Sequence, residues 1–361
     1  MQIDEQYMRR CFELARLGAG NTSPNPMVGA VLVADGRIIG EGWHRRYGQA
    51  HAEVNAVADV PESLRNRLPD STLYVSLEPC CIHGRTPPCT DLIIKERIPR
   101  VVVSVIDMTP GVSGKGLAIL REAGVEVRCG MLAEEGARLS LVRNTYVGRN
   151  RPYVVLKWAQ TPGGFMGVPG RQVWISGELS RRLTHRLRQR CDAILVGTNT
   201  ALTDDPALDN RYWWGRSPLR IVLDREGRLP AGSKLLDGSR PTWILTEKTP
   251  LQSANQNIDY VRLPFDQELL PTLMTKLYEQ RITSLLVEGG ATTLQHFIQH
   301  QLWDEVWIFS GQVQIDDGIP APEIGGHIEQ VFTCGGDEVT VLSSLAARSW
   351  LDEIVTRSRA S

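Results

Sequence analysis

Residues 51 to 89 constrain this chain more than any other stretch of its sequence. They contain His51-Ala52-Glu53 and, further on, Pro79-Cys80, with Cys89 nine residues after Cys80. One imidazole and two thiolates can hold a Zn²⁺ ion and leave its fourth position open for water, which is the pattern of a catalytic site. The sequence therefore predicts a catalytic zinc site with His51, Cys80 and Cys89 as its ligands.

A carboxylate two residues after the histidine indicates which chemistry this zinc would serve. Zinc lowers the pKa of its bound water and gives a nucleophile near neutral pH, which can attack a ring carbon that bears an amino group. Ammonia leaves only after protonation, so a carboxylate that does not bind the metal must carry the proton, as in zinc deaminases. We expect Glu53 to be this proton shuttle. Because helix positions i and i+2 point about 200° apart, His51 and Glu53 can share a site only at the start of a helix.

Two other interpretations of these residues remain open. The zinc site could be closed and structural, with Cys81 or His83 as the fourth ligand. Alternatively, the thiols could be buried core residues that bind no metal. Glu53 separates the interpretations, because a purely structural zinc site has no need of that carboxylate.

Composition narrows the class of protein further. A chain of 361 residues is long enough for two domains, and a net charge of −1 gives it no general attraction to nucleic acid. Seven cysteines, three of them near the predicted metal site, favour a reducing compartment. The N-terminus lacks the apolar core of a signal peptide, and no apolar run is long enough to cross a bilayer. We therefore expect a cytoplasmic protein.

The hydrophobic pattern predicts an α/β fold for the N-terminal part. A first helix should contain Tyr7 and Phe12, because apolar residues recur there at helical spacing. The order β-β-α-β-α-β-α-β then predicts a three-layer α/β/α domain that ends near Val142, with a linker over residues 144–152. Strands are expected at residues 30–33, 37–42, 71–77, 101–106 and 125–127, and helices at 54–60 and 117–123.

A second α/β domain is expected from Tyr153 onward. A helix over 178–190 carries five arginines, which could form a solvated face or could include a phosphate contact. Gly289 and Gly290 separate a predicted strand from a predicted helix, where backbone N–H groups could approach a phosphate, although a tight turn needs glycine too. No G-x-G-x-x-G sequence is present. Strands are expected at residues 153–158, 192–197, 220–223, 242–246, 284–287 and 305–309.

Taken together, these features resemble the bifunctional riboflavin-biosynthesis deaminase–reductase family over nearly the whole chain. The N-terminal motifs that carry the resemblance are Pro24-Asn25-Pro26, Gly42-x-His44, His51-Ala52-Glu53, Leu77-Glu78-Pro79-Cys80, His83-Gly84-Arg85-Thr86-Pro87-Pro88-Cys89 and Gly114-Lys115-Gly116. The C-terminal motifs are Leu156-Lys157, Trp174-Ile175, Asp192 to Gly197, Asp204-Asp205-Pro206-x-Leu208, Val287-Glu288-Gly289-Gly290 and Asp304-Glu305.

The resemblance implies two consecutive reactions. A cytidine-deaminase-like domain over residues 1–145 would remove the 2-amino group of 2,5-diamino-6-(5-phosphoribosylamino)pyrimidin-4-one. A dihydrofolate-reductase-like domain over residues 146–361 would then use NADPH to reduce the ribosyl chain to ribityl. The resemblance also suggests a homo-oligomer, and Arg225 is a candidate contact for the 2′-phosphate of NADPH.

Residues at matching positions take the following roles by resemblance. His51, Cys80 and Cys89 would bind zinc and Glu53 would be catalytic. The substrate positions are Asn25, His44, Arg188, Leu208, Arg211 and Glu288. The cofactor positions are Ala159, Trp174, Thr200, Asp204, Gly289, Gly290, Ala291, Thr292 and Thr293.

The sequence departs from the family pattern at several places. Cys81-Ile82 replaces the usual Ser-His after the first zinc cysteine, and Thr109 replaces an asparagine. The usual Ser/Thr-Leu-Asp-Gly-Arg/Lys turn has become Thr161-Pro162-Gly163-Gly164-Phe165, without its acid and base, and Gln172 aligns with a substrate-contacting serine. The runner-up interpretation is therefore a deaminase whose C-terminal domain no longer reduces. A nucleic-acid-editing deaminase and a non-enzymatic binding protein fit less well, because the chain lacks a basic character and contains Glu53.

Overall fold

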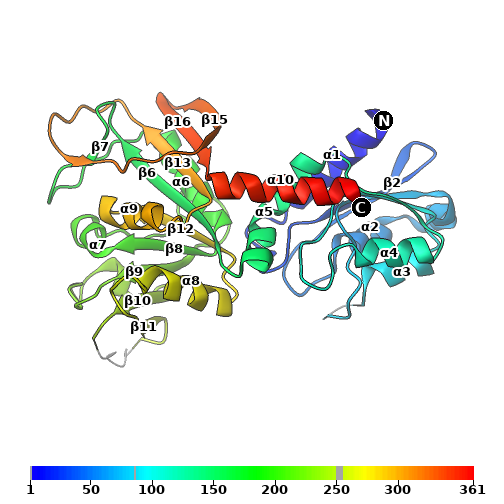
Figure 1. The fold of residues 1–361 in the computed structure, drawn as a ribbon, viewed down its shortest axis with the longest axis horizontal. Helices are drawn as coiled ribbons and strands as arrows, with labels where there is room; N and C mark the ends of the chain where they lie inside the picture. The colour runs from blue at the N-terminus through cyan, green and yellow to red at the C-terminus, as the bar shows by residue number, and fades with distance from the viewer. Residues whose placement is uncertain (1, 85–86, 249–254) are drawn as a thin grey trace. The chain divides into compact units, whose positions relative to one another are not determined.

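The structure is a computed structural model that describes residues 2–84, 87–248 and 255–361. It divides the chain into two compact units, Met1–Asn150 together with Ser349–Ser361, and Arg151–Arg348 (Figure 1). Each unit has its own sheet and its own hydrophobic core.

A five-stranded sheet forms the middle layer of the first unit, in the order β2-β1-β3-β4-β5. The β1 strand runs antiparallel to β2 and β3, whereas β3, β4 and β5 are parallel to one another. The strands are β1 (Gly29–Ala34), β2 (Arg37–Trp43), β3 (Thr72–Leu77), β4 (Arg100–Val105) and β5 (Glu126–Arg128).

Helices cover both faces of this sheet. Met8 and Phe12 of α1 pack with Val31 and Val102 on one face, while α2, α3 and α4 pack on the other, against residues such as Leu32 (Figure 1). The three-layer α/β/α prediction is therefore confirmed. The helices are α1 (Gln2–Arg16), α2 (Ala52–Asp59), α3 (Cys89–Lys95), α4 (Lys115–Glu122) and α5 (Ala133–Arg149), with a 3₁₀ segment η1 (Glu62–Asp70).

The predicted linker over residues 144–152 is wrong, because α5 continues to Arg149. Part of this stretch is buried: Asn144 is 0% exposed, and the backbone of Gly148 approaches the Trp350 ring so closely that a Cβ would lie 2.5 Å from it. Trp350 belongs to α10 (Leu345–Ala360), whose residues from Ser349 onward are part of the first unit. The second compact unit is therefore shorter at both ends than the predicted 146–361.

The second unit is built on a nine-stranded sheet with the order β11-β10-β9-β8-β12-β6-β13-β16-β15. Its strands are parallel except at one edge, where β16 runs antiparallel to β13 and β15. The strands of this unit are β6 (Tyr153–Gln160), β7 (Phe165–Gly167), β8 (Ala193–Gly197), β9 (Leu219–Leu223), β10 (Thr242–Thr246), β11 (Ile258–Arg262), β12 (Ser284–Gly289), β13 (Glu305–Ser310), β14 (Ile319–Pro320), β15 (His327–Cys334) and β16 (Asp337–Ser343).

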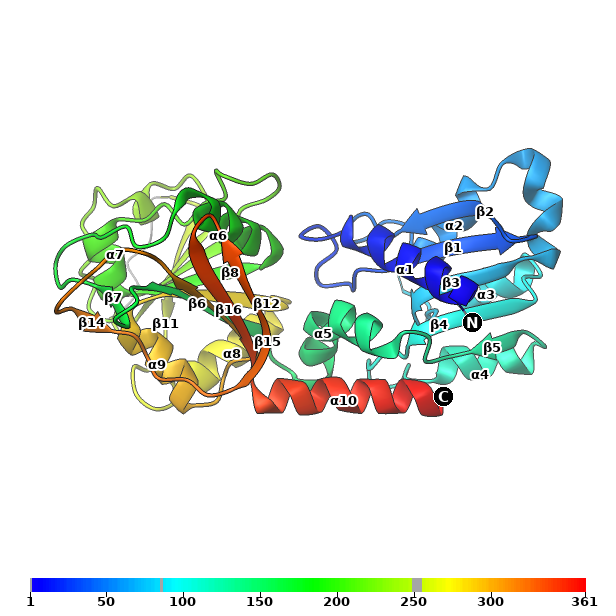
Figure 2. The same ribbon diagram turned by 90° about the horizontal axis from the view of Figure 1, so that it is seen from above.

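Helices lie on both faces of this second sheet as well. Figure 2 shows α6 on one side and α8 and α9 on the other. Leu273 of α8 and Phe297 of α9 are fully buried against β6, β8 and β12, whereas Leu183 of α6 packs with Phe309 and Val339. The helices are α6 (Glu178–Arg190), α7 (Thr198–Asp204), α8 (Leu269–Glu279) and α9 (Ala291–Gln299), with a 3₁₀ turn η2 (Lys234–Leu236). The α/β prediction holds for both units.

Candidate active site

The predicted zinc ligands come together at the starts of two helices of the first unit. His51 is the residue that precedes α2, Cys89 is the first residue of α3, and Cys80 lies in the loop after β3. The Sγ atoms of Cys80 and Cys89 each lie 3.4 Å from His51 Nδ1, and the three ligand atoms lie within 4.8 Å of one another. In the part of the chain that the structure describes, no other group of His, Cys, Asp or Glu has metal-binding spacing.

The protonation of the two thiols fits a metal cation at this place. A hydrogen bond with Cys89, supported by His51, lowers the pKa of Cys80 to about 4, whereas the same hydrogen bond and burial raise the pKa of Cys89. A thiolate that lies beside a second thiol suits a divalent ion, which binds sulfur ligands in their deprotonated form. An imidazole and two sulfur donors suit zinc.

Glu53 lies in the first turn of α2 and is only 3% exposed. Burial, together with the negative charge of Cys80, raises the pKa of this carboxyl to about 7. A group with a pKa near neutrality can both accept and donate a proton in one reaction cycle. The expected arrangement of His51 and Glu53 at a helix start is thus what the structure contains.

His44 and Asn25 lie beside the zinc ligands. The rings of His44 and His51 meet edge to face, with centroids 5.4 Å apart. Because the Ala50 carbonyl can only accept, the proton of His44 resides on Nδ1, which lies 3.0 Å from that oxygen. Nε2 then accepts from the amide of Asn25 at 3.2 Å. Burial lowers the pKa of His44, so the imidazole beside His51 is neutral and is hydrogen-bonded to the Asn25 amide.

The alternative ligands Cys81 and His83 are placed differently. His83 is largely exposed, and its Nε2 lies 4.0 Å from a carboxylate oxygen of Asp91. Cys81 is half-buried, and burial raises the pKa of its thiol. Neither belongs to the ligand group, which favours an open zinc site over a closed one. Arg85 and Thr86 of the same motif lie outside the described residues.

Glu78 fixes the loop that carries Cys80, a role that the sequence did not reveal. Its buried carboxylate accepts backbone N–H groups of Asp107, Gly114 and Gly116 at 2.8 to 3.0 Å. Gly116 lies so close to this loop that a Cβ there would be 2.3 Å from the Pro79 carbonyl oxygen. Three donors on one carboxylate hold the loop in a single geometry.

Gly42 of β2 allows α2 to lie close enough to bring His51 and Glu53 into the site. A Cβ on Gly42 would lie 2.3 Å from Ala56 N and 2.4 Å from Ala52 O. We therefore expect Gly42→Ala to displace the start of α2 and to lower ammonia release by about 10²-fold, since a displacement of about 1 Å can cost that much. The control is Gly232→Ala, where the added methyl group meets open space. Unchanged ammonia release in Gly42→Ala would show that the position of α2 tolerates a shift.

The charged residues among the predicted substrate positions of the second unit form an ionic cluster, in which Arg188 and Glu288 are largely buried and Arg211 is 45% exposed. Arg188 donates from Nε and Nη2 to the two carboxylate oxygens of Glu288, each at 2.7 Å. Its Nη1 donates to the backbone oxygen of Asp209 at 2.9 Å, and the Asp209 carboxylate accepts from Arg211 at 2.6 Å. Leu208 is buried beside them in the chain and has a positive φ of 46°.

Four of the predicted cofactor residues meet where β8 and β12 end. A Cβ on Gly289 would lie 2.9 Å from the Thr200 side chain, and Gly290 lies close to both Thr200 and Thr293. Gly290 has a φ of 80° and precedes α9, so this turn requires glycine. The carboxyl ends of parallel strands are where α/β sheets bind their ligands.

The other predicted cofactor positions lie outside this group of four residues. Ala159 pairs with Phe309 across β6 and β13, Asp204 ends α7, and Trp174 is largely exposed, with Arg181 over its ring. Ala291 and Thr292 form the first turn of α9. Arg225 is exposed and donates to Glu247 at 2.7 Å.

The altered turn at residues 161–165 is held together by hydrogen bonds of Thr161, although it lacks the usual acid and base. Buried Thr161 binds Phe165 through both its backbone N–H and its side-chain oxygen, and Gly164 has a φ of 78°. Gln172 is exposed. Lys157, which the sequence placed only within a motif, contributes a cation beside Glu288 and Arg188, and burial lowers its pKa. The sequence signal that could have marked Lys157 as a site residue is that it is a single lysine in an otherwise apolar strand.

The fold and the ligand group define the first unit as a zinc-dependent deaminase of the cytidine deaminase class. Residues 1–105 match the family described as the cytidine and deoxycytidylate deaminase zinc-binding region, and residues 152–313 match the RibD C-terminal domain. The chain belongs to the riboflavin biosynthesis protein RibD family, whose members join a deaminase and a reductase.

Individual relatives agree with this family over nearly their whole length. The Riboflavin biosynthesis protein RibD of Aquifex aeolicus is 39% identical over 333 residues, which cover 90% of this chain and 91% of that protein. The RibD of Escherichia coli is 35% identical and covers 85% and 87%. The crystal structure of the Thermotoga maritima deaminase/reductase superposes with a TM-score of 0.85 at 35% identity, covering 95% of this chain and 99% of that one.

Helices within residues 2–84, 87–248 and 255–361 include none that is both long enough and apolar enough to cross a membrane.

Proposed function

We propose that the first unit deaminates 2,5-diamino-6-(5-phosphoribosylamino)pyrimidin-4-one at its 2-amino group, and that the second unit reduces the ribosyl chain of the product with NADPH. The observation that carries the first step is the buried Glu53 carboxyl in the first turn of α2, beside one imidazole and two thiols. The Thermotoga maritima relative bears the name of these two activities.

Each residue of the first site has a distinct task in the deamination. His51, Cys80 and Cys89 would hold zinc, which supplies a nucleophile near neutral pH by acidifying a bound water. The Glu53 carboxylate accepts the proton that water loses and delivers it to the exocyclic nitrogen, so that ammonia leaves and a carbonyl replaces the amino group. Asn25 and neutral His44 orient the pyrimidine ring. Burial of Glu53 keeps bulk water from competing for this proton.

In the second unit, the ionic cluster would bind the substrate, and the glycine turn would bind the cofactor. Arg188 and Arg211 bind the phosphorylated substrate, with Glu288 fixing the Arg188 guanidinium from the other side. Thr200, Gly289, Gly290 and Thr293 would hold the phosphates of NADPH at the start of α9. NADPH bound there would supply the hydride for C1′ of the ring-opened ribose.

A coupled assay tests both steps on one preparation. Purified protein receives the diaminopyrimidine phosphate and NADPH, and ammonia release and NADPH oxidation are followed together. We expect oxidation to begin only after ammonia appears, because reduction acts on the deaminated product. Ammonia without oxidation would contradict the second step and would favour a deaminase joined to a reductase-like unit of altered chemistry.

A further inference from the structure

Three guanidinium groups of the second unit converge on Asp209. Arg211 Nη1 donates to Oδ1 at 2.6 Å, Arg240 Nη2 lies 3.8 Å from Oδ2, and Arg188 Nη1 donates to the backbone oxygen at 2.9 Å. Arg240 comes from the segment before β10, far in sequence from the other two. Neither its position in the chain nor any motif marks it as a site residue.

The charges around Asp209 show what Arg240 adds to this cluster. Glu288 faces both Arg188 and Lys157, and Arg188 forms a two-point ion pair with it. Around Asp209, the positive charge of Arg211 alone would be neutralised by the negative charge of the Asp209 carboxylate. Burial lowers the pKa of nearby His185 to about 4, so this imidazole adds no positive charge near neutral pH. Arg240 therefore supplies the excess positive charge that this side needs to attract a dianion.

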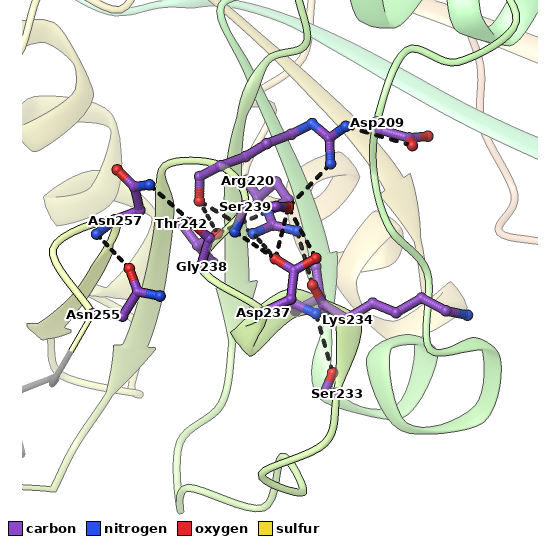
Figure 3. Close-up of polar contacts among 12 residues, drawn as sticks. Asp209, Arg220, Ser233, Lys234, Asp237, Gly238, Ser239, Thr242, Asn255 and Asn257 are labelled. Atoms are coloured by element: carbon purple, nitrogen blue, oxygen red, sulfur yellow. Dashed lines mark hydrogen bonds and ion pairs between the residues drawn. The ribbon is translucent and has the colours of Figure 1, made fainter.

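A buried arginine holds the backbone at Arg240 in place. Arg220 is 0% exposed, and it donates to Thr242 Oγ1 at 2.8 Å, to the Lys234 carbonyl at 2.9 Å, and to Asp237 Oδ1 at 3.0 Å and the Arg240 carbonyl at 3.1 Å (Figure 3). The Thr242 hydroxyl donates to the same Arg240 carbonyl at 3.0 Å. Because the backbone is already fixed, less conformational entropy is lost when the side chain binds a ligand.

The side chains that would meet a ligand are accessible. Arg211 is 45% exposed and Arg240 is 35% exposed, in contrast to buried Arg220. A guanidinium has five N–H donors, and Arg240 uses Nη1 toward Ser239 and Nη2 toward Asp209. Donors therefore remain for a phosphate, which guanidinium groups bind through parallel hydrogen bonds.

We propose that Arg240 is a substrate-binding residue: together with Arg211 it forms a guanidinium pair, seated on Asp209, that takes the phosphate of the reductase substrate. This inference depends on the proposed function of the second unit, and it assigns to that site a residue that determines specificity for phosphorylated over unphosphorylated substrate.

The test compares 5-amino-6-(5-phosphoribosylamino)uracil with its dephosphorylated form in NADPH oxidation. For Arg240→Gln we expect kcat/KM on the phosphorylated compound to fall about tenfold or more, mainly through KM, since a hydrogen bond to a charged group is lost. Activity on the dephosphorylated compound should stay the same. Arg182→Gln is the matched control, because Arg182 is an exposed arginine on α6 that pairs with Glu178.

Two outcomes of the kinetic comparison would overturn the role of Arg240. Wild-type activity of Arg240→Gln on the phosphorylated compound would show that the residue does not contact the phosphate. An equal loss on both compounds would show that it only positions Asp209 or supports the fold. Calorimetric binding of the phosphorylated compound without NADPH makes the test independent of reduction: equal Kd values for wild type and variant overturn the role even if the second unit does not reduce. Failure of the wild-type protein to bind would overturn the inference and the proposed reductase substrate together.

Discussion

The Glu53→Gln variant should retain its zinc and lose ammonia release by about 10²- to 10⁴-fold, the usual contribution of a positioned acid–base group. Glutamine matches the shape of glutamate, so the packing of this buried side chain at the start of α2 is kept. What disappears is the carboxyl group whose pKa of about 7 lets it take up and release a proton. Ammonia release and zinc content of the purified variant are the two measurements.

The chain contains its own control for this variant. Reduction takes place in the second unit, so Glu53→Gln supplied with the deaminated product should oxidise NADPH at the wild-type rate. Glu62→Gln, at a side chain that is 93% exposed, is the matched surface substitution. Ammonia release near the wild-type rate in Glu53→Gln would remove the proton-shuttle role, whereas loss of zinc or of NADPH oxidation would indicate a structural defect.

Much of the fold could be predicted because its signals are local. Apolar runs gave the buried strands β4 and β8, and the helix over 178–190 and the strand over 242–246 have the predicted bounds. The predicted linker failed for a physical reason. Asn144, Thr145 and Gly148 are residue types common in linkers, yet here Asn144 and Thr145 belong to the buried face of α5, and Gly148 lies against the ring of Trp350 from about 200 residues later in the chain.

The two sites differ in how far sequence alone could describe them. In the first unit, each ligand belongs to a short motif with a chemical reason, and the structure brings His51, Cys80 and Cys89 together as expected. Glu78 and Gly42 support these motifs through backbone contacts, which residue types do not reveal.

In the second unit, the site depends on contacts between segments that lie far apart in the sequence. Arg188 and Glu288 are 100 residues apart, and Asp209 joins Arg211 to Arg240. The sequence places Arg220 only at the start of an expected strand, yet its side chain is fully buried and organises the segment up to Thr242. Such a residue looks like a solvated charge until its partners are known, because charged side chains are seldom buried without them.

The neighbouring cysteines Cys80 and Cys81 permit a sharp test of the metal site. Cys80 and Cys89 each place Sγ 3.4 Å from His51 Nδ1, and the backbone N–H of Cys89 donates to Cys80 Sγ at 3.3 Å. Cys81 lies outside this group. We therefore expect Cys80→Ser and Cys89→Ser to lose most of their zinc and nearly all ammonia release, because a soft thiolate donor is replaced by a hydroxyl.

Cys81→Ser is the matched control, since it makes the same sulfur-to-oxygen change one residue away. It should keep about one zinc per chain, as expected of a mononuclear catalytic site, and should release ammonia at a rate close to wild type. Zinc content by atomic emission and ammonia release would be measured on all three variants, with NADPH oxidation on the deaminated product as the check of folding. Loss of zinc from Cys81→Ser, with zinc retained in Cys80→Ser, would mean that the ligand is the second thiol of the pair. In that case the loop after β3 would have to turn Cys81 toward His51, and the three bonds that Glu78 makes to backbone N–H groups would have to rearrange with it.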